Sequence, residues 1–201
     1  MNDIDGVSRE TSERLNIYAT LLKKWNSRIN LVARSTIDSL WTRHFVDSAQ
    51  VYGLAPSRVT HWVDLGSGGG FPGLIAAILG AERTNGFRTT LIESDARKSA
   101  FLRSVIRETA INATVITERI EAAPRQNADI LSARALADLS TLLSFAELHM
   151  IADGRALFSK GENWRRELSE AQSKWQFDYQ VDNSKTEIGP VILSVTGVLR
   201  A

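Results

Sequence analysis

The chain has 201 residues, 43% of them hydrophobic and 23% charged, which is enough to bury the core of one globular domain. Its net charge of +1 makes no general case for nucleic-acid binding, and the lack of cysteine excludes disulfides, thiolate nucleophiles and cysteine-ligated zinc. There is no apolar run near the roughly 18 residues of a membrane span, the first segment is unlike a secretory signal, and the three histidines are scattered. We therefore expect a cytoplasmic protein without a membrane segment or a metal site.

The segment up to residue 57 predicts a helical extension. Between Ser8 and Leu31 the apolar residues recur three and four positions apart, the spacing of one helical face: Leu15, Tyr18, Leu22, Trp25 and Ile29. A second helix is predicted from near Thr36 to Gly53, with Pro56 beyond it as a stop signal. Both helices precede the main part of the domain.

Positive charge is concentrated in the same segment. Between Arg14 and Arg43 there are six basic residues and a single acid, Asp38. Such a basic face fits phosphate binding, but a solvated helix surface explains it just as simply. The pattern alone leaves both interpretations open.

Residues 58–201 alternate short apolar runs with helical patterns, which is typical of a parallel sheet covered by helices on both faces. The strands are predicted at Val59 to Leu65, Thr89 to Glu93, Thr114 to Glu118, Asp129 to Ala133 and Arg155 to Ser159. The helices between them are predicted at Pro72 to Leu79, Ala96 to Ala110 and Leu139 to Met150. A helix from Glu162 to Trp175 precedes a terminal hairpin of Phe177 to Val181 and Val191 to Val198. The pattern predicts an α/β fold with a mostly parallel sheet.

The most informative segment runs from Val63 to Gly73 and reads VDLGSGGGFPG. An apolar strand meets a glycine-rich turn there, and Pro72 sits where the first helical residue is expected, since its fixed φ suits that position and its missing N–H costs nothing. Bare backbone at a helix N-terminus allows a ligand to approach closely. In an open parallel sheet, this first crossover is the usual place for a nucleotide.

Two ligand classes fit this loop. Gly68-x-Gly70-x-x-Gly73 matches the dinucleotide fingerprint, and Glu93 follows at the expected interval of about 20 residues. Asp64, however, would repel a pyrophosphate and would attract the ammonium and sulfonium groups of S-adenosylmethionine. The order Asp-x-Gly-x-Gly-x-Gly therefore favours the methyl donor, and a nicotinamide-dependent oxidoreductase is the alternative.

Glu93 closes the second predicted strand. An acid at this place accepts hydrogen bonds from ribose hydroxyls in nucleotide-binding folds. The alternative is a surface acid or a partner of the next helix.

Further motifs accompany the segment from Asp64 to Gly73. They are Lys24-Trp25-Asn26, Asn30-Leu31, Arg43-His44-Phe45-Val46-Asp47-Ser48, Glu93-Ser94, Phe101-Leu102-Arg103, Ser132-Ala133-Arg134-Ala135-Leu136-Ala137 and Lys160-Gly161. Through them nearly the whole chain resembles the small-subunit (16S) rRNA guanine-N7 methyltransferases, also called the glucose-inhibited division protein B family. The resemblance implies a class I S-adenosylmethionine-dependent methyltransferase with a Rossmann-like, seven-stranded sheet. We expect a single domain over residues 1–201, with a helical extension (1–57) before the catalytic core (58–201).

The resemblance also implies a set of cofactor contacts. In the glycine loop these are Gly66, Ser67, Gly68 and Phe71, and beyond it Ile120, Glu121 and Arg134, in addition to Asp64 and Glu93. Ile120 would pack against adenine, and Arg134 would hold a carboxylate or a phosphate bidentately. Without the resemblance, core packing for Ile120 and a surface acid for Glu121 are the favoured interpretations.

The implied partner is 16S rRNA or the small ribosomal subunit, bound by a monomer. The basic residues expected to meet RNA are Arg28, Arg34, Arg43, His44 and Lys160. The pair Arg43-His44 fits equally well a role in anchoring the second helix to the domain.

Guanine N7 carries a lone pair and no proton, so it can attack the sulfonium methyl group without a general base. We therefore predict no proton-transferring catalytic residue, only groups that hold two reactants together. The chain lacks an Asn-Pro-Pro-Tyr or Asp-Pro-Pro-Tyr motif after the fourth strand, which argues against methylation of an exocyclic amine. A ribosome-binding protein that keeps the donor pocket without turnover is a second alternative.

Overall fold

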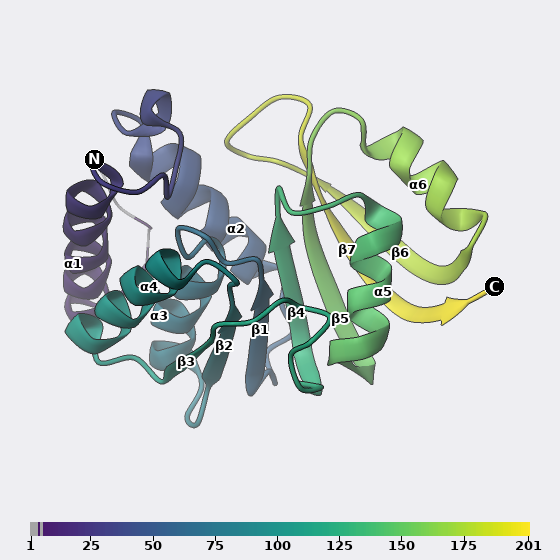
Figure 1. Cartoon of the computed structure of the whole chain (residues 1–201), viewed down its shortest axis with the longest axis horizontal. Helices are drawn as coiled ribbons and strands as arrows, with labels where there is room; N and C mark the ends of the chain where they lie inside the picture. Colours follow the sequence, from purple (N-terminus) through teal and green to yellow (C-terminus); the bar gives the residue numbers. More distant parts are fainter. Residues whose placement is uncertain (1–3, 5) are drawn as a thin grey trace.

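A seven-stranded sheet lies at the centre of the computed structural model, which describes residue 4 and residues 6–201 (Figure 1). The strand order is β3-β2-β1-β4-β5-β7-β6. The strands are β1 (His61–Leu65), β2 (Arg88–Ile92), β3 (Ala113–Ile116), β4 (Ala128–Arg134), β5 (Met150–Lys160), β6 (Trp175–Asn183) and β7 (Val191–Arg200). β7 runs antiparallel to both β5 and β6, while the other neighbours are parallel. This architecture confirms the predicted sheet and its terminal hairpin.

Helices cover both faces of this sheet (Figure 1). They are α1 (Arg9–Asn26), α2 (Asp47–Gly53), α3 (Gly73–Arg83), α4 (Ala96–Thr109), α5 (Leu139–His149) and α6 (Trp164–Gln172). None of the helices in the described part of the chain combines the length and apolar character that a membrane crossing requires.

Successive strand residues divide between two buried clusters, as the two-residue period of a strand demands. Trp62 packs with the side chains of α1 to α4, whereas its neighbour Val63 packs with those of α5 and α6. The first cluster also contains Leu15 and Leu22 of α1. The N-terminal helical segment thus shares its core with the strands that follow it.

The glycine loop after β1 directly contacts this N-terminal segment. The buried Tyr18 hydroxyl donates a hydrogen bond to the carbonyl of Gly69. A Cβ atom added at Gly69 would lie 3.0 Å from the carbonyl oxygen of Leu31. The backbone of the loop is therefore closely packed against residues far back in the chain.

The second predicted helix, from Thr36 to Gly53, is wrong as a single helix. The chain instead forms a 3₁₀ turn η1 (Arg34–Thr36), a π-helical stretch η2 (Trp41–Val46) and then α2. A π-helix uses more residues per turn than an α-helix and shifts the side chains that follow it. Here the irregular stretch contains Arg43 and His44, which line a cavity described below.

Several element ends also differ from the prediction, two of them near the site or the sheet core. Pro72 immediately precedes α3 and occupies its N-cap position, so the helix begins one residue later than expected. β5 begins at Met150 and includes a register shift opposite β4, five residues before the predicted start at Arg155. Of the added residues, Met150 pairs with Ala128, a contact that an apolar pattern does not reveal.

Candidate active site

The glycine loop lies at the carboxyl edge of the parallel strands, between β1 and α3. Gly66 and Gly68 both have positive φ, 60° and 53°, a conformation that L side chains rarely adopt. A Cβ atom at Gly66 would also lie 2.5 Å from Leu136 Cδ1. At Gly68 it would meet nothing nearer than the Gly66 oxygen at 3.7 Å, so the absent side chain leaves space at the wall of a cavity.

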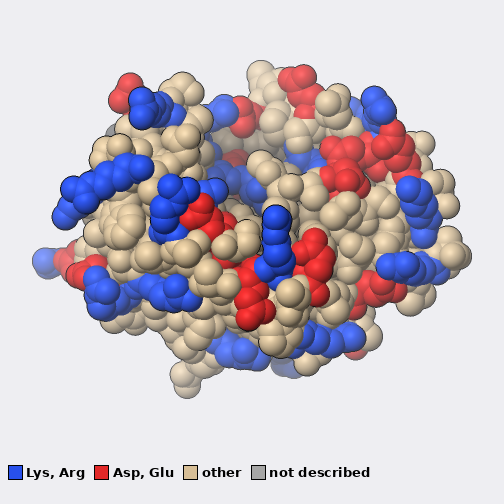
Figure 2. Space-filling model, in the orientation of Figure 1, with Lys and Arg blue, Asp and Glu red and all other residues tan. Residues whose placement is uncertain are grey.

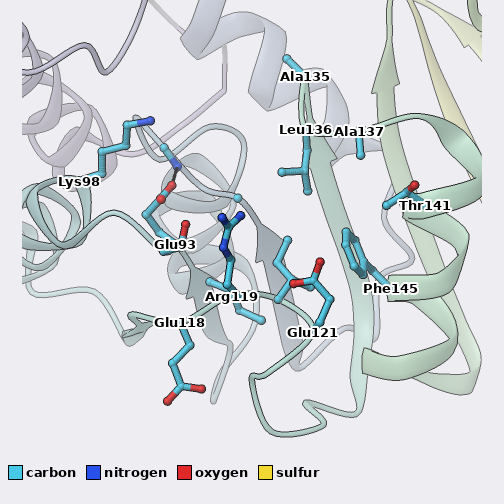
Figure 3. Close-up of a pocket in the computed structure, with 15 residues that line it drawn as sticks. Glu93, Lys98, Glu118, Arg119, Glu121, Ala135, Leu136, Ala137, Thr141 and Phe145 are labelled. Atoms are coloured by element: carbon cyan, nitrogen blue, oxygen red, sulfur yellow. Dashed lines mark hydrogen bonds between the residues drawn. The ribbon is translucent and has the colours of Figure 1, made fainter.

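Glu93, which follows β2, holds this loop in place. Its carboxylate accepts one hydrogen bond from the Gly68 N–H (Figure 3) and another from the Asp95 N–H, both 2.8 Å long. The side chain is 7% exposed and lines the same cavity. Each carboxylate oxygen has a second lone pair, so these bonds leave acceptor capacity toward the cavity.

The cavity has a volume of about 410 Å³ and opens beside the ends of β1, β2 and β4. Five of the predicted cofactor residues line it: Gly66, Gly68, Glu93, Ile120 and Glu121. Arg119 and Glu121 point into it, whereas Glu118 points away (Figure 3). We call it the first cavity.

Several residues of the first cavity have no counterpart in the sequence prediction. They are Lys98, Arg119, Leu136, Ala137, Thr141 and Phe145. Most of them follow strand ends or lie in the first turns of α4 and α5. That position was the only feature of the sequence from which they could have been predicted.

Ile120 is buried, and its carbonyl accepts a hydrogen bond from His149 Nε2 at 2.9 Å. Because the acceptor is a carbonyl oxygen, this nitrogen must carry the proton. Burial lowers the pKa of His149, so the ring is neutral near pH 7. His149 therefore fixes the backbone that forms this side of the first cavity.

Asp64 does not line the first cavity, contrary to the prediction that it faces the ligand. In β1 it shares the face of Trp62, which is turned toward α3, and its side chain is completely buried. Its Oδ1 accepts a hydrogen bond from the Ser132 hydroxyl at 2.6 Å. Burial raises the pKa of this carboxyl to about 6.

Ser67 is likewise a part of the turn and not of the cavity wall. Its hydroxyl donates to the Asp64 carbonyl, and its N–H donates to the Ile92 carbonyl. Both bonds close the turn at the end of β1.

Phe71 and Arg134 belong to a different part of the site. The Phe71 ring stacks between Tyr18 and His44, with ring centres 5.2 and 5.1 Å apart, and the Arg134 guanidinium lies 5.0 Å from its centre. Arg134 also makes an ion pair of 3.4 Å with Asp47. Neither residue lines the first cavity.

Arg134 instead lines a second cavity of about 330 Å³, between the N-terminal segment and the β6–β7 loop. Figure 2 shows the surface hollowed between these parts, with charged side chains inside the hollow. Ala135, at the end of β4, lines both cavities. The two cavities therefore adjoin each other at the carboxyl edge of the sheet.

The five predicted RNA-binding residues fall into two groups. Arg43, His44 and Lys160 line the second cavity, whereas Arg28 and Arg34 are exposed elsewhere on the N-terminal segment. Lys160 is largely buried, donates to the Ala137 carbonyl and pairs with Glu167.

His44 is a neutral side chain that packs within the N-terminal segment. Burial, together with the cations Arg134 and Arg43, lowers its pKa to about 3, so it carries no charge near pH 7. Its Nε2 bonds the Thr36 hydroxyl at 2.8 Å, while Arg43 pairs with Glu187. These contacts favour the anchoring role of the pair over direct phosphate binding.

Known structures define the class of this fold. A TehB-like S-adenosylmethionine-dependent methyltransferase from Corynebacterium glutamicum aligns with a TM-score of 0.57 at 15% identity, over 94% of this chain and 99% of that one. A ribosomal protein L11 methylase from Lactobacillus delbrueckii aligns with a TM-score of 0.60 at 14% identity, over 80% and 79% of the two chains. The fold is that of the class I methyltransferases.

Sequence comparison identifies the family. The model of GidB, rRNA small subunit methyltransferase G, matches residues 11–191. Ribosomal RNA small subunit methyltransferase G of Ruegeria pomeroyi is 56% identical over 96% of this chain and 95% of its own length, and that of Paracoccus denitrificans is 48% identical over 97% and 99%. The chain belongs to the rRNA small subunit methyltransferase G family, which confirms the resemblance and removes the oxidoreductase alternative.

Proposed function

We propose that this protein transfers the methyl group of S-adenosylmethionine to N7 of one guanine in 16S rRNA. It acts in the cytoplasm, as a monomer, on the rRNA or the small ribosomal subunit. The observation that carries this proposal is the meeting of two cavities at Ala135, beside the glycine loop of a chain that belongs to this family. One cavity suits the donor and the other suits the acceptor base.

The first cavity fits the donor in size and in chemistry. Its volume of about 410 Å³ lies in the range of small-ligand sites. Ile120 and Phe145 offer apolar walls for a purine ring, and Glu93 offers carboxylate oxygens for ribose hydroxyls. Gly66 and Gly68 let the ligand approach the backbone. Bound S-adenosylmethionine supplies a methyl group on a cationic sulfur.

The chain's contribution to the reaction is positioning. Guanine N7 needs no deprotonation, and His44, the histidine beside the second cavity, is neutral near pH 7. Holding two reactants in line within adjoining cavities contributes up to about 7 to 11 kcal/mol in favourable cases. Phe71 and Arg134 stabilise the wall between the N-terminal segment and β4.

Mass mapping of N7-methylguanine in 16S rRNA, with and without the protein, tests this function. We expect one such mark to depend on the protein. Ribosomal RNA carrying 7-deazaguanine at that position should bind and accept no methyl group, because carbon replaces the attacking nitrogen. Transfer to the analogue would show that another atom is modified. If no N7-methylguanine depends on the protein, the alternative of a ribosome-binding protein without turnover would be favoured.

A further inference from the structure

The second cavity is closed on one side by the loop between β6 and β7, which reaches toward the N-terminal helical segment (Figure 1). The Thr186 hydroxyl donates to Asp47 Oδ1 at 2.7 Å, and the Lys185 N–H donates to Gln50 Oε1 at 2.8 Å. Arg43 forms an ion pair with Glu187. These bonds join residues more than 130 positions apart in the chain and fix the loop over the cavity.

Two acids of the second cavity differ in their free acceptor capacity. Asp47 Oδ1 already accepts hydrogen bonds from Thr186 and Gln50, and its Oδ2 faces Arg134. Glu187 uses Oε1 for Arg43, and its Oε2 makes no hydrogen bond to the described residues. The Glu187 side chain is 36% exposed, so it is accessible from the cavity it lines.

Guanine offers a matching pattern of donors. Its Watson–Crick edge presents the N1–H and the N2 amine, which a single carboxylate can accept together, and N7 lies on the opposite side of the base. Enzymes that modify a base inside a nucleic acid commonly take it out of the stack and read that edge. Adenine would present an unprotonated N1 and no N2 amine, so a carboxylate there rejects it.

We propose that the second cavity receives the target guanine and that Glu187 reads its N1–H and N2 amine, leaving N7 directed toward the first cavity at Ala135. The inference rests on the proposed function and adds to it the residue that selects the base. Arg43 holds the carboxylate in place through their ion pair. Asp47 keeps the loop docked through Thr186.

Inosine tests this reading because it lacks the N2 amine and keeps the N7 lone pair. For the wild-type protein, 16S rRNA with inosine at the target should show a kcat/KM about tenfold to a hundredfold below that of guanine, the effect of losing one hydrogen bond to a charged acceptor. This measurement needs no variant, so it does not depend on the folding of one.

A Glu187→Gln variant locates the discrimination. Arg43 needs the single amide oxygen of Gln, so the amide NH2 group faces the base, where both guanine donors need an acceptor. Transfer to guanine should therefore fall and the guanine-to-inosine ratio should approach one, while calorimetric affinity for S-adenosylmethionine is retained. Glu162→Gln is the matched control, since Glu162 is exposed near the same loop and does not line the cavity. It should keep the wild-type ratio.

Equal transfer to guanine and inosine by the wild-type protein would overturn the inference, and so would a Glu187→Gln variant that keeps full discrimination. Neither result would touch the proposed function. Failure of the wild-type protein to methylate native 16S rRNA would overturn the proposed function together with this inference.

Discussion

Asp64 shows at the scale of one residue how burial changes a carboxyl group. Its side chain has 0% exposure, and Oδ2 has no hydrogen-bond partner among the described residues. Burial is the main cause of its raised pKa, about 6 against an ordinary value near 3.9. The folded protein therefore holds this proton more tightly than the unfolded chain does.

The consequence for stability has a definite sign. Between about pH 4 and pH 6 the folded state binds more protons than the unfolded state, so this group lowers the free energy of unfolding as the pH rises through that window. For a pKa difference of roughly two, this loss of unfolding free energy amounts to about 3 kcal/mol at most. Asp64→Asn should abolish it, because Asn does not titrate. Asn keeps an oxygen for the Ser132 hydroxyl. Urea unfolding from pH 4 to pH 7 measures the effect, and exposed Asp153→Asn is the control. An unchanged pH dependence in the Asp64 variant would refute it.

At the scale of elements, the loop between β1 and α3 depends on an acid from the end of β2. Glu93 bonds the Gly68 N–H, and we propose that it also accepts from the donor's ribose. Glu93→Ala should weaken S-adenosylmethionine binding by about tenfold to a hundredfold, equivalent to roughly 1.5 to 3 kcal/mol. RNA affinity should barely change. Calorimetry measures the donor affinity, with exposed Glu108→Ala on α4 as the control. Unaltered donor affinity would remove Glu93 from the site.

A separate prediction concerns RNA binding by the basic surface of the N-terminal segment. Arg28 and Arg34 are exposed and form no ion pair with the described residues. Replacing both with alanine should weaken 16S rRNA binding and make the logarithmic salt slope shallower by about 0.7 to 0.9 per lost phosphate contact.

The control for that experiment removes the same charge elsewhere. Arg107 and Arg166 are exposed and already paired with Glu108 and Glu170. Their double alanine variant should retain the wild-type slope. If the Arg28 and Arg34 variant retains it as well, those residues are only a solvated helix face.

At the scale of the whole molecule, we propose that the helical extension and the catalytic core fold as one domain. α1 shares a buried cluster with α3 and α4, and its Tyr18 hydroxyl binds the glycine loop. Removing one part would expose the apolar surface of the other, which favours a single cooperative transition.

Urea unfolding checks this proposal with two probes. Tryptophan fluorescence reports on both parts, because Trp25 and Trp41 lie in the extension and Trp62, Trp164 and Trp175 lie in the core. Circular dichroism reports on all helices and strands. The two transitions should coincide at one midpoint, and an earlier transition confined to Trp25 and Trp41 would show a separate unit.

Local patterns were enough to predict most elements of this fold. Sequence patterns indicated α1, α3, α4, α5 and α6 and all seven strands, because each period depends only on neighbours in the chain. The glycine loop and Glu93 were found the same way, as a turn and a strand end. The pattern failed between Thr36 and Gly53, where a π-helical stretch replaces a regular helix.

The sequence by itself determined the family, the sheet and the edge at which the site lies. Only the tertiary structure decided which way the site residues face. Asp64 turns toward α3 because that helix covers its side of β1, and Arg134 turns from the first cavity to Phe71 and Asp47. Glu187 meets Arg43 across 144 positions of sequence. Contacts of this kind depend on how distant elements pack, and no local period encodes them.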